Sequence, residues 1–159
     1  MLVNGVGYDS HVFKAGRKLI LGGIQIPHEV GLDGHSDADA LCHAIIDAIL
    51  GACGMRDIGC LFPDTDRTLK DADSIELLKK VMQQIHNAQV EYIDSIVITQ
   101  KPKIADFIPA MKERLAFAIG INQDRINIKG KTNENMGFVG RSEGLAVIAT
   151  ATVERKFNV

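Results

Sequence analysis

Asp9 and His11 are the first residues in the chain whose types and spacing could do chemistry. They fall in a stretch, residues 2–13, that is rich in Val and Gly and alternates loosely, as a strand does. Residues two apart in a strand point to the same face, and a helix packed on that face could add His43. One carboxylate and two imidazoles suit a catalytic Zn²⁺, which leaves one position for substrate. The alternatives are a simple hydrogen-bonded Asp-His pair and an ordinary polar histidine on a helix.

A second candidate is the Gly-His-Ser-Asp-Ala-Asp block that begins at Gly34. Ser36 and Asp39 resemble a capping box, which predicts a helix that begins at Ser36 with its aspartates at the positive end of the dipole. Capping alone explains these residues, but it does not require His35. An ionisable side chain beside backbone amides at a helix start could receive an oxyanion, so a structural and a functional role both remain open.

A third candidate is the polar segment from Gly130 to Arg141, between two predicted strands. Lys131, Thr132 and Arg141 can donate hydrogen bonds to phosphate, and Glu134 could bind a divalent cation beside them. The segment lacks the spacing of a P-loop. A loop of small and polar residues is also expected at this place for structural reasons alone.

These candidates must be positioned by a mixed sheet covered by helices, of the α+β or α/β class. Extended residues 2–13 and 18–26 could form a hairpin through Ala15-Gly16. The helical spacing of Leu41, Ile45 and Ile49 supports the first helix, and residues 54–70 form a long loop that is a candidate functional loop. The remaining predicted elements are helices at 72–86 and 106–118 and strands at 90–99, 125–129 and 145–153, the last of which is uncharged and so central.

Composition restricts the number of domains, the classes of partner and the cellular compartment. The chain has 159 residues, 46% hydrophobic and 24% charged, which predicts one globular domain over residues 1–159. A net charge of −2 gives no general attraction for nucleic acid or an anionic membrane. Nine aspartates lie between Asp33 and Asp73 and could hold a cation, although aspartate also favours turns. Three cysteines without metal-ligand spacing, and no secretion signal, predict a reducing cytoplasm; Cys42 and Cys53 are expected in the core.

Taken together and in this order, the motifs resemble the 2-C-methyl-D-erythritol 2,4-cyclodiphosphate synthase family over the whole chain. Each motif is modest, but seven of them in register are specific. They are Gly7-Tyr8-Asp9-Ser10-His11, the block from Gly34 with His43 behind it, Asp57-Ile58-Gly59, Phe62 to Asp66, Ala72-Asp73-Ser74, Pro102-Lys103, and Gly137-Phe138-x-Gly140-Arg141.

The resemblance implies a fold, an assembly and a reaction. The fold is a mixed four-stranded sheet plus a small hairpin with helices on one face. Three chains form a homotrimer with the sheets around a central axis and the active sites between neighbouring subunits. The reaction belongs to the non-mevalonate isoprenoid pathway: the 2-phosphate of 4-diphosphocytidyl-2-C-methyl-D-erythritol 2-phosphate attacks the β-phosphorus, and CMP leaves. The chain is expected to be a cytoplasmic, bacterial-type form without a transit peptide, and the axial cavity can hold an isoprenoid diphosphate.

The resemblance also implies roles for residues. Asp9, His11 and His43 match the zinc ligands, Glu134 matches the ligand of a second ion, Mg²⁺ or Mn²⁺, and His35 and Thr132 match catalytic residues that stabilise the transition state. The positions that match substrate contacts, some of them shared with those roles, are Asp9, His11, His35, Ser36, Asp57, Gly59, Phe62, Pro63, Asp64, Thr65, Asp66, Thr99, Gln100, Lys101, Pro102, Lys103, Ile104, Ala105, Lys131, Thr132, Asn133, Glu134, Phe138 and Arg141. Within this set, Ser36, Asp57, Gly59 and the segment from Phe62 to Asp66 match the sugar-phosphate site, and the segment from Thr99 to Ala105 with Lys131 matches the cytidine site of the adjoining subunit.

Four positions depart from the family pattern. Ser10 stands where valine is common, and Lys101, Lys131 and Asn133 differ beside the cytidine site, which bears on nucleotide contacts. Two other functions use the same residues. A metal-dependent phosphohydrolase would use the Asp-His-His site with water as the nucleophile, and a trimeric module that binds metal or isoprenoid diphosphate would show binding without turnover.

Overall fold

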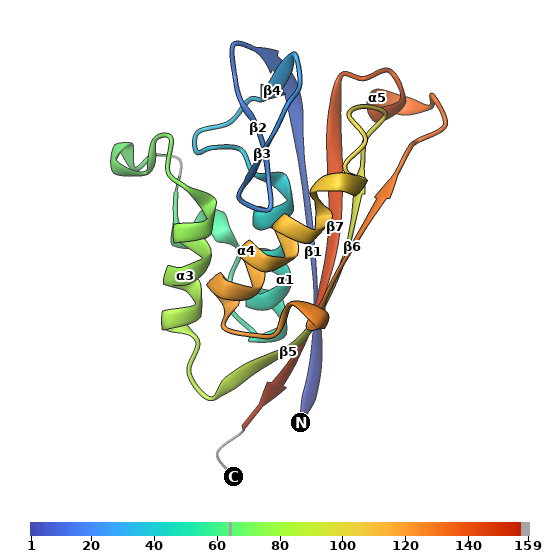
Figure 1. Cartoon of the computed structure of the whole chain (residues 1–159). Coiled ribbons are helices and arrows are strands. Elements are labelled where there is room, and N and C mark those ends of the chain that lie inside the picture. Colours follow the sequence, from blue (N-terminus) through green and yellow to red (C-terminus); the bar gives the residue numbers. More distant parts are fainter. Residues whose placement is uncertain (64, 157–159) are drawn as a thin grey trace.

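A computed structural model of the chain describes residues 1–63 and 65–156. Its centre is a mixed five-stranded sheet in the order β4-β1-β7-β5-β6, beside a two-stranded hairpin, β2-β3 (Figure 1). The strands are β1 (Leu2–Ala15), β2 (Leu19–Leu21), β3 (Ile24–Ile26), β4 (Val30–Leu32), β5 (Ala88–Ile98), β6 (Ile126–Lys131) and β7 (Gly144–Arg155). The mixed sheet and separate hairpin are confirmed; the short strand β4 adds a fifth member to the four expected.

Strand β7 is central, as its uncharged sequence predicts, and runs antiparallel to β1 and β5. Strands β5 and β6 run parallel. One face of β7 is buried through Val147, Ala149 and Ala151, whereas Ile148 on the other face is 40% exposed. The register pairs Asp9 with Val147 and Tyr8 with Ile148, so Asp9 lies on the buried face and Tyr8 on the open one.

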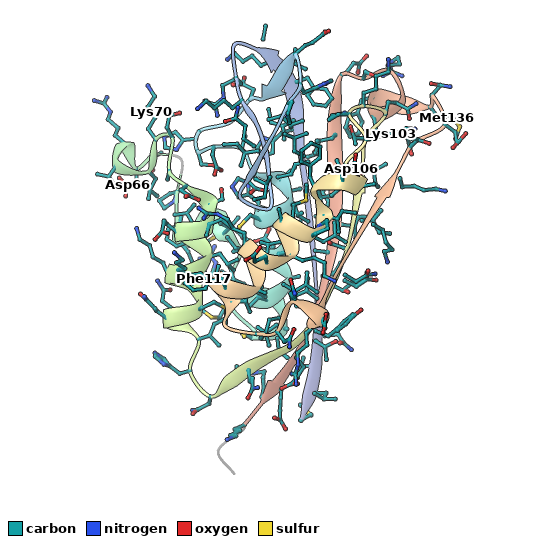
Figure 2. The ribbon with its side chains drawn as sticks, in the orientation of Figure 1. Asp66, Lys70, Lys103, Asp106, Phe117 and Met136 are labelled. Atoms are coloured by element: carbon teal, nitrogen blue, oxygen red, sulfur yellow. The ribbon has the colours of Figure 1, made fainter. Side chains whose placement is uncertain are left out.

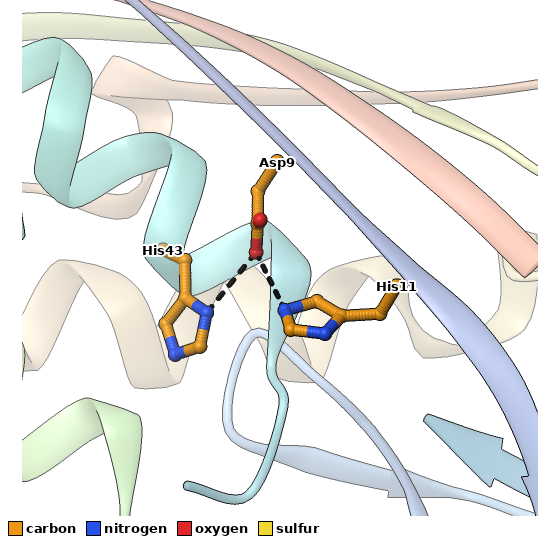
Figure 3. Close-up of side chains that lie close together, drawn as sticks. All are labelled: Asp9, His11 and His43. Atoms are coloured by element: carbon orange, nitrogen blue, oxygen red, sulfur yellow. Dashed lines mark hydrogen bonds and ion pairs between the residues drawn. The ribbon is translucent and has the colours of Figure 1, made fainter. Parts of the chain in front are cut away.

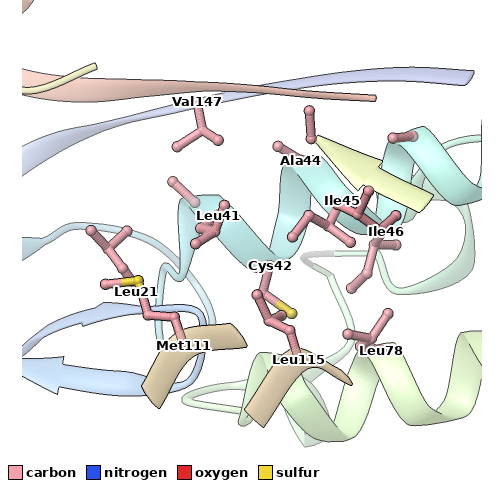
Figure 4. Close-up of a cluster of buried hydrophobic side chains, with 14 of the residues drawn as sticks. Leu21, Leu41, Cys42, Ala44, Ile45, Ile46, Leu78, Met111, Leu115 and Val147 are labelled. Carbon is pink, nitrogen blue, oxygen red and sulfur yellow. The ribbon is translucent and has the colours of Figure 1, made fainter. Parts of the chain in front are cut away.

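Three helices cover the buried face: α1 (Ala40–Ala52), α3 (Ser74–Gln84) and α4 (Ile108–Ile119) (Figure 1). Helix α1 packs directly on β1 because glycines face it. A Cβ atom at Gly5 would lie 2.0 Å from the Ala48 carbonyl oxygen, and one at Gly7 would lie 1.9 Å from that of Ala44. The opposite side of α1 joins the core formed with α3 and α4 (Figure 4). Close approach of α1 therefore fixes its side chains against β1.

Two local predictions are wrong. The first helix begins at Ala40, not at Ser36, because the cap is Asp39, whose side chain accepts a hydrogen bond from the Cys42 amide. Residues 2–13 do not form a hairpin with 18–26 either. The turn lies at Gly22-Gly23, where both residues have positive φ, and it joins β2 to β3, while the end of β1 pairs with β4.

The predicted long loop contains two short helical segments, α2 (Ile58–Leu61) and η1 (Arg67–Leu69). Other short segments are η2 (Ala105–Phe107), η3 (Gln123–Arg125) and α5 (Gly137–Gly140). Among the residues that the structure covers, no helix has the length and apolarity needed to cross a membrane.

Candidate metal centre and active site

Asp9, His11 and His43 converge on one point between β1 and α1 (Figure 3). One ligand atom from each of these residues lies within 4.8 Å of the others. Oδ2 of Asp9 is shared: it lies 2.9 Å from Nε2 of His11 and 3.0 Å from Nδ1 of His43. The alternation of β1 and the glycines under α1 produce this arrangement, so the expected meeting of strand and helix is confirmed.

The hydrogen bonding of His11 shows that this group fits a cation. Its Nδ1 lies 2.7 Å from the Asp33 carbonyl oxygen, which can only accept, so Nδ1–H donates and Nε2 carries a lone pair. Nε2 is buried and, within the described part of the chain, makes no hydrogen bond, although the carboxylate of Asp9 is adjacent. A lone pair held against a carboxylate oxygen is favourable when a cation lies between them, and two imidazoles with one carboxylate are ligands typical of Zn²⁺.

Electrostatics couple Asp9 to both imidazoles. Burial would raise the pKa of Asp9, but the close polar contacts and charge interactions with His11 and His43 outweigh it and lower that pKa to about 2. Burial would likewise lower the pKa of His11, but the neighbouring carboxylate raises it above 6.5. The carboxylate is therefore ionised at neutral pH, as a metal ligand must be.

The three residues open into a cavity of about 260 Å³. His35, Ser36, Gly59 and Phe62, all expected at the substrate site, line this cavity as well. The chain around His35 is fixed by contacts that the sequence does not show. The Arg17 guanidinium donates to the Ser36 carbonyl at 2.6 Å, and the Asp71 amide donates to the His35 carbonyl at 2.9 Å.

Other residues expected at the sugar-phosphate site lie elsewhere in the single chain. Asp57 is the N-cap of α2 and accepts from the Cys60 amide at 3.0 Å. Asp66 caps η1 through Thr68. Pro63 and Thr65 are exposed, and Asp64 lies outside the described residues. Asp57 and Asp66 thus each have a structural partner within their own loop.

A second cavity, of about 240 Å³, lies between the start of α4 and the end of β6. Most of the expected cytidine-site residues line it: Thr99, Gln100, Pro102, Lys103, Ile104, Ala105 and Lys131. Thr132, expected to be catalytic, lines it too, together with Ile108 and Gly130. Lys101 is exposed and does not line it. The Gln100 side chain accepts from the Asn133 amide at 2.8 Å and donates to Asn135 at 3.0 Å, so it braces the loop after β6.

The single chain does not bring the two cavities together. They share no lining residue, so His35 and Thr132 face different spaces. Glu134 accepts a hydrogen bond from the Thr132 hydroxyl at 2.9 Å and is not part of the Asp9 group. Figure 2 shows Asp66 and Lys70 on the opposite side of the molecule from Lys103 and Met136. Phe138 lies beside Ser10 and Val12, and Arg141 pairs with Glu143 at 2.8 Å.

The sequence did not predict a role for Ser74, whose hydroxyl contacts the second ring nitrogen of His43. Nε2 lies 2.8 Å from the Ser74 hydroxyl, which in turn contacts Asp37. Ser74 is fully buried at the start of α3. The only sequence signal was its place in the Ala72-Asp73-Ser74 motif.

Comparisons with known proteins agree on one family. Residues 2–154 match the YgbB family. The chain is 55% identical over 152 residues to 2-C-methyl-D-erythritol 2,4-cyclodiphosphate synthase from Syntrophus aciditrophicus, covering 94% of this chain and 96% of that one. The structure of the bifunctional IspDF from Campylobacter jejuni has a TM-score of 0.93 at 42% identity; the match covers 98% of this chain but only 43% of that longer protein.

A CDP complex of IspF from Plasmodium falciparum has a TM-score of 0.85 at 32% identity, covering 98% of this chain and 97% of that one. The sequence and structure comparisons each extend over nearly the whole chain. The chain therefore belongs to the YgbB family.

Proposed function

We infer that this chain is an enzyme of the non-mevalonate isoprenoid pathway, a lyase that converts 4-diphosphocytidyl-2-C-methyl-D-erythritol 2-phosphate to 2-C-methyl-D-erythritol 2,4-cyclodiphosphate and CMP. The observation that carries this function is the convergence of Asp9, His11 and His43 at a cavity, in a chain 55% identical to a cyclodiphosphate synthase. One domain over residues 1–159 is expected to do this, in the cytoplasm.

Asp9, His11 and His43 would hold Zn²⁺ at the wall of the first cavity. The buried, unbonded Nε2 of His11 and the ionised carboxylate of Asp9 support that role. When bound, the cation supplies Lewis-acid chemistry that withdraws charge from a phosphate oxygen. Glu134 would hold a second divalent ion, Mg²⁺ or Mn²⁺, and hard cations of that kind prefer carboxylate ligands.

The chain's own residues fold and orient the substrate. Both reacting phosphates belong to one molecule, so the protein must bring two mutually repelling groups into line, without a covalent intermediate on the enzyme. His35, Ser36, Gly59 and Phe62, which line the first cavity, would bind the sugar-phosphate part. Asp57 and the rest of the segment from Phe62 to Asp66 would add contacts from beside it. His35 and the Thr132 hydroxyl would donate hydrogen bonds where negative charge accumulates.

The second cavity would receive the cytidine part, through Thr99 to Ala105 and Lys131. A related structure bound to CDP supports a nucleotide at this fold. Because the two cavities are separate in one chain, we propose a homotrimer in which each active site joins the first cavity of one subunit to the second cavity of its neighbour. Exposed apolar residues on the open sheet face support that assembly: Val6, Tyr8 and Val12 are 67%, 56% and 56% exposed. Phe138 and Arg141 would lie near the axis of this trimer, where they would face a bound isoprenoid diphosphate.

The bond changes distinguish cyclisation from hydrolysis. In cyclisation an oxygen of the 2-phosphate forms a bond to the β-phosphorus, the bond from that phosphorus to the bridging oxygen breaks, and CMP departs with that oxygen. No water is consumed. A phosphohydrolase would instead add one water oxygen to the product.

Product analysis in ¹⁸O-labelled water tests the function directly. We expect equal amounts of CMP and cyclic diphosphate, with no label in either, by mass spectrometry. A linear product that carries ¹⁸O would show a phosphohydrolase. Tight binding of the substrate with no product in a metal-supplemented assay would show a binding module.

A further inference from the structure

The imidazole of His43 is held from behind by a buried hydroxyl and a carboxylate. Its Nε2 lies 2.8 Å from Oγ of Ser74, which donates a hydrogen bond to Oδ1 of Asp37. The Ser74 amide donates to Oδ2 of the same carboxylate at 2.9 Å. Ser74 is fully buried, and Nδ1 of His43 faces Asp9 on the other side of the ring.

The direction of these hydrogen bonds follows from the number of protons available. The carboxylate of Asp37 receives three donors: the hydroxyl and amide of Ser74 and the Asp39 amide at 3.1 Å. An ionised carboxylate can only accept, so the single hydroxyl proton of Ser74 is committed to Asp37. The hydroxyl oxygen then accepts from Nε2–H of His43, which leaves a lone pair on Nδ1 for a metal ion.

Ser36 is the other hydroxyl near this nitrogen, at 3.3 Å. Its oxygen is farther away and accepts the Ala38 amide, also at 3.3 Å. No carboxylate orients this hydroxyl in the described structure. Ser74 is therefore the group that decides which nitrogen of His43 carries the proton.

We propose that Ser74 and Asp37 are positioning residues for the metal ligand His43, forming a carboxylate–hydroxyl–imidazole relay that presents Nδ1 to the cation. This inference rests on the proposed metal site and extends it to two residues outside the ligand set. Metal-bound histidines commonly donate their other ring N–H to a carboxylate or carbonyl, and loss of that partner weakens metal binding about 10- to 100-fold. Here the serine hydroxyl transmits the effect of the carboxylate.

The relay also gives the Ala72-Asp73-Ser74 motif a role that capping does not supply. Asp73 caps α3 by accepting from the Ile75 amide at 2.8 Å, so the helix start does not depend on the Ser74 side chain. The Asp37 amide donates to the Ala72 carbonyl at 3.1 Å, which joins the loop before α1 to the start of α3. The backbone of both segments therefore holds hydroxyl and carboxylate in place.

Metal affinity of the full-length chain tests the relay. Metal-free wild type, Ser74→Ala, Asp37→Asn and Ser74→Thr would be titrated with Zn²⁺ against a competing chelator. We expect Ser74→Ala and Asp37→Asn to weaken binding about 10- to 100-fold and Ser74→Thr, which keeps the hydroxyl, to stay close to wild type. Ser95→Ala is the matched control and should not change the affinity, because it removes a buried hydroxyl whose one hydrogen bond among the described residues goes to the Asn127 carbonyl in β6.

A second measurement needs no variant. In the Zn²⁺-loaded wild-type protein, proton NMR should show a slowly exchanging Nε2–H of His43 with a cross-peak to the β-protons of Ser74. A rapidly exchanging Nε2–H, or folded Ser74→Ala and Asp37→Asn with unchanged affinity, would overturn the relay. If the wild type bound no Zn²⁺, or if His43→Ala bound it with unchanged affinity, the metal site itself would be overturned, and the relay with it.

Discussion

Asp9 and Asp39 are both withdrawn from water, but their neighbours shift their pKa values in opposite directions. Two imidazoles face Asp9 and lower its pKa to about 2 against the effect of burial. Asp39 is fully buried; burial and the charge of Asp37 raise its pKa to about 6, against three hydrogen bonds from the amides of Cys42, Gly23 and Gly22. The same residue type is therefore suited to metal binding at one position and to capping at the other.

The raised pKa of Asp39 predicts a pH-dependent loss of stability. Its pKa is 3.8 in the unfolded chain and about 6 in the folded one, so the folded state binds the proton more tightly. The stabilisation by that proton is complete below about pH 4 and is lost as the pH rises through about 6, a change on the order of 3 kcal/mol. Asp39→Asn cannot titrate, so the free energy of unfolding of wild type should fall relative to this variant over that range. Urea denaturation of the metal-free proteins at several pH values measures the difference.

Asp39→Asn should also be less stable than wild type throughout, because an amide has one oxygen for the three N–H donors. This offset is the same at every pH. It therefore does not hide the pH effect, which is a change with pH in the difference between the two free energies of unfolding. Parallel stability profiles for the two proteins between pH 4 and 6 would contradict the raised pKa.

At the scale of elements, the position of α1 decides whether a metal site exists. Its contact with β1 depends on Gly7, where a Cβ atom would lie 1.9 Å from the Ala44 carbonyl, one residue from His43. We expect Gly7→Ala to destabilise the chain by about 1–3 kcal/mol or more through overpacking, and to weaken Zn²⁺ binding because α1 must shift. Urea denaturation and metal titration measure the two effects.

Gly51→Ala is the matched control for that substitution. Gly51 lies in α1 and faces β1, but a Cβ atom added there would lie 3.8 Å from its nearest neighbour, the Cα atom of Gly5. Because alanine has a higher helix propensity than glycine, Gly51→Ala should be about 0.5–1 kcal/mol more stable than wild type, and its metal affinity should be unchanged. If Gly7→Ala matched it in stability and affinity, close packing of β1 and α1 would not be what positions His43.

The sequence alone was sufficient for features that depend on local pattern. Alternation placed Asp9 and His11 on one face, helical spacing placed His43, and the uncharged run at 145–153 predicted the central strand. It was insufficient where distant segments compete for the same groups. Asp39 rather than Ser36 caps α1 because the amides of Gly22 and Gly23 also point at its carboxylate. The contact of His43 with Ser74 joins residues 31 positions apart, which no local pattern encodes.

At the scale of the whole molecule, one chain contains two separate cavities, each of which we propose to be half of an active site. His43 belongs to the first cavity and Thr132 to the second, and their lining residues do not overlap. The open face of the sheet, with Tyr8 and Ile148 paired across β1 and β7, is the surface through which copies would associate. If neighbouring subunits complete each active site, damage to the two halves need not lie in the same subunit.

Mixing two inactive variants tests this arrangement. His43→Ala disables only the first half-site and Thr132→Ala only the second, so each homotrimer should lack turnover. In mixed trimers, an active site is intact when its first cavity comes from a Thr132→Ala subunit and its second cavity from a His43→Ala subunit. Random assembly from equal amounts of both variants gives this combination at about one quarter of the sites, averaged over all trimers. Double purification of coexpressed, differently tagged subunits removes the homotrimers. Each mixed trimer then has one intact site in three, so this fraction should recover about a third of wild-type turnover. The doubly substituted chain is the control and should recover none; if the mixed trimers recovered none either, each active site would lie within a single subunit.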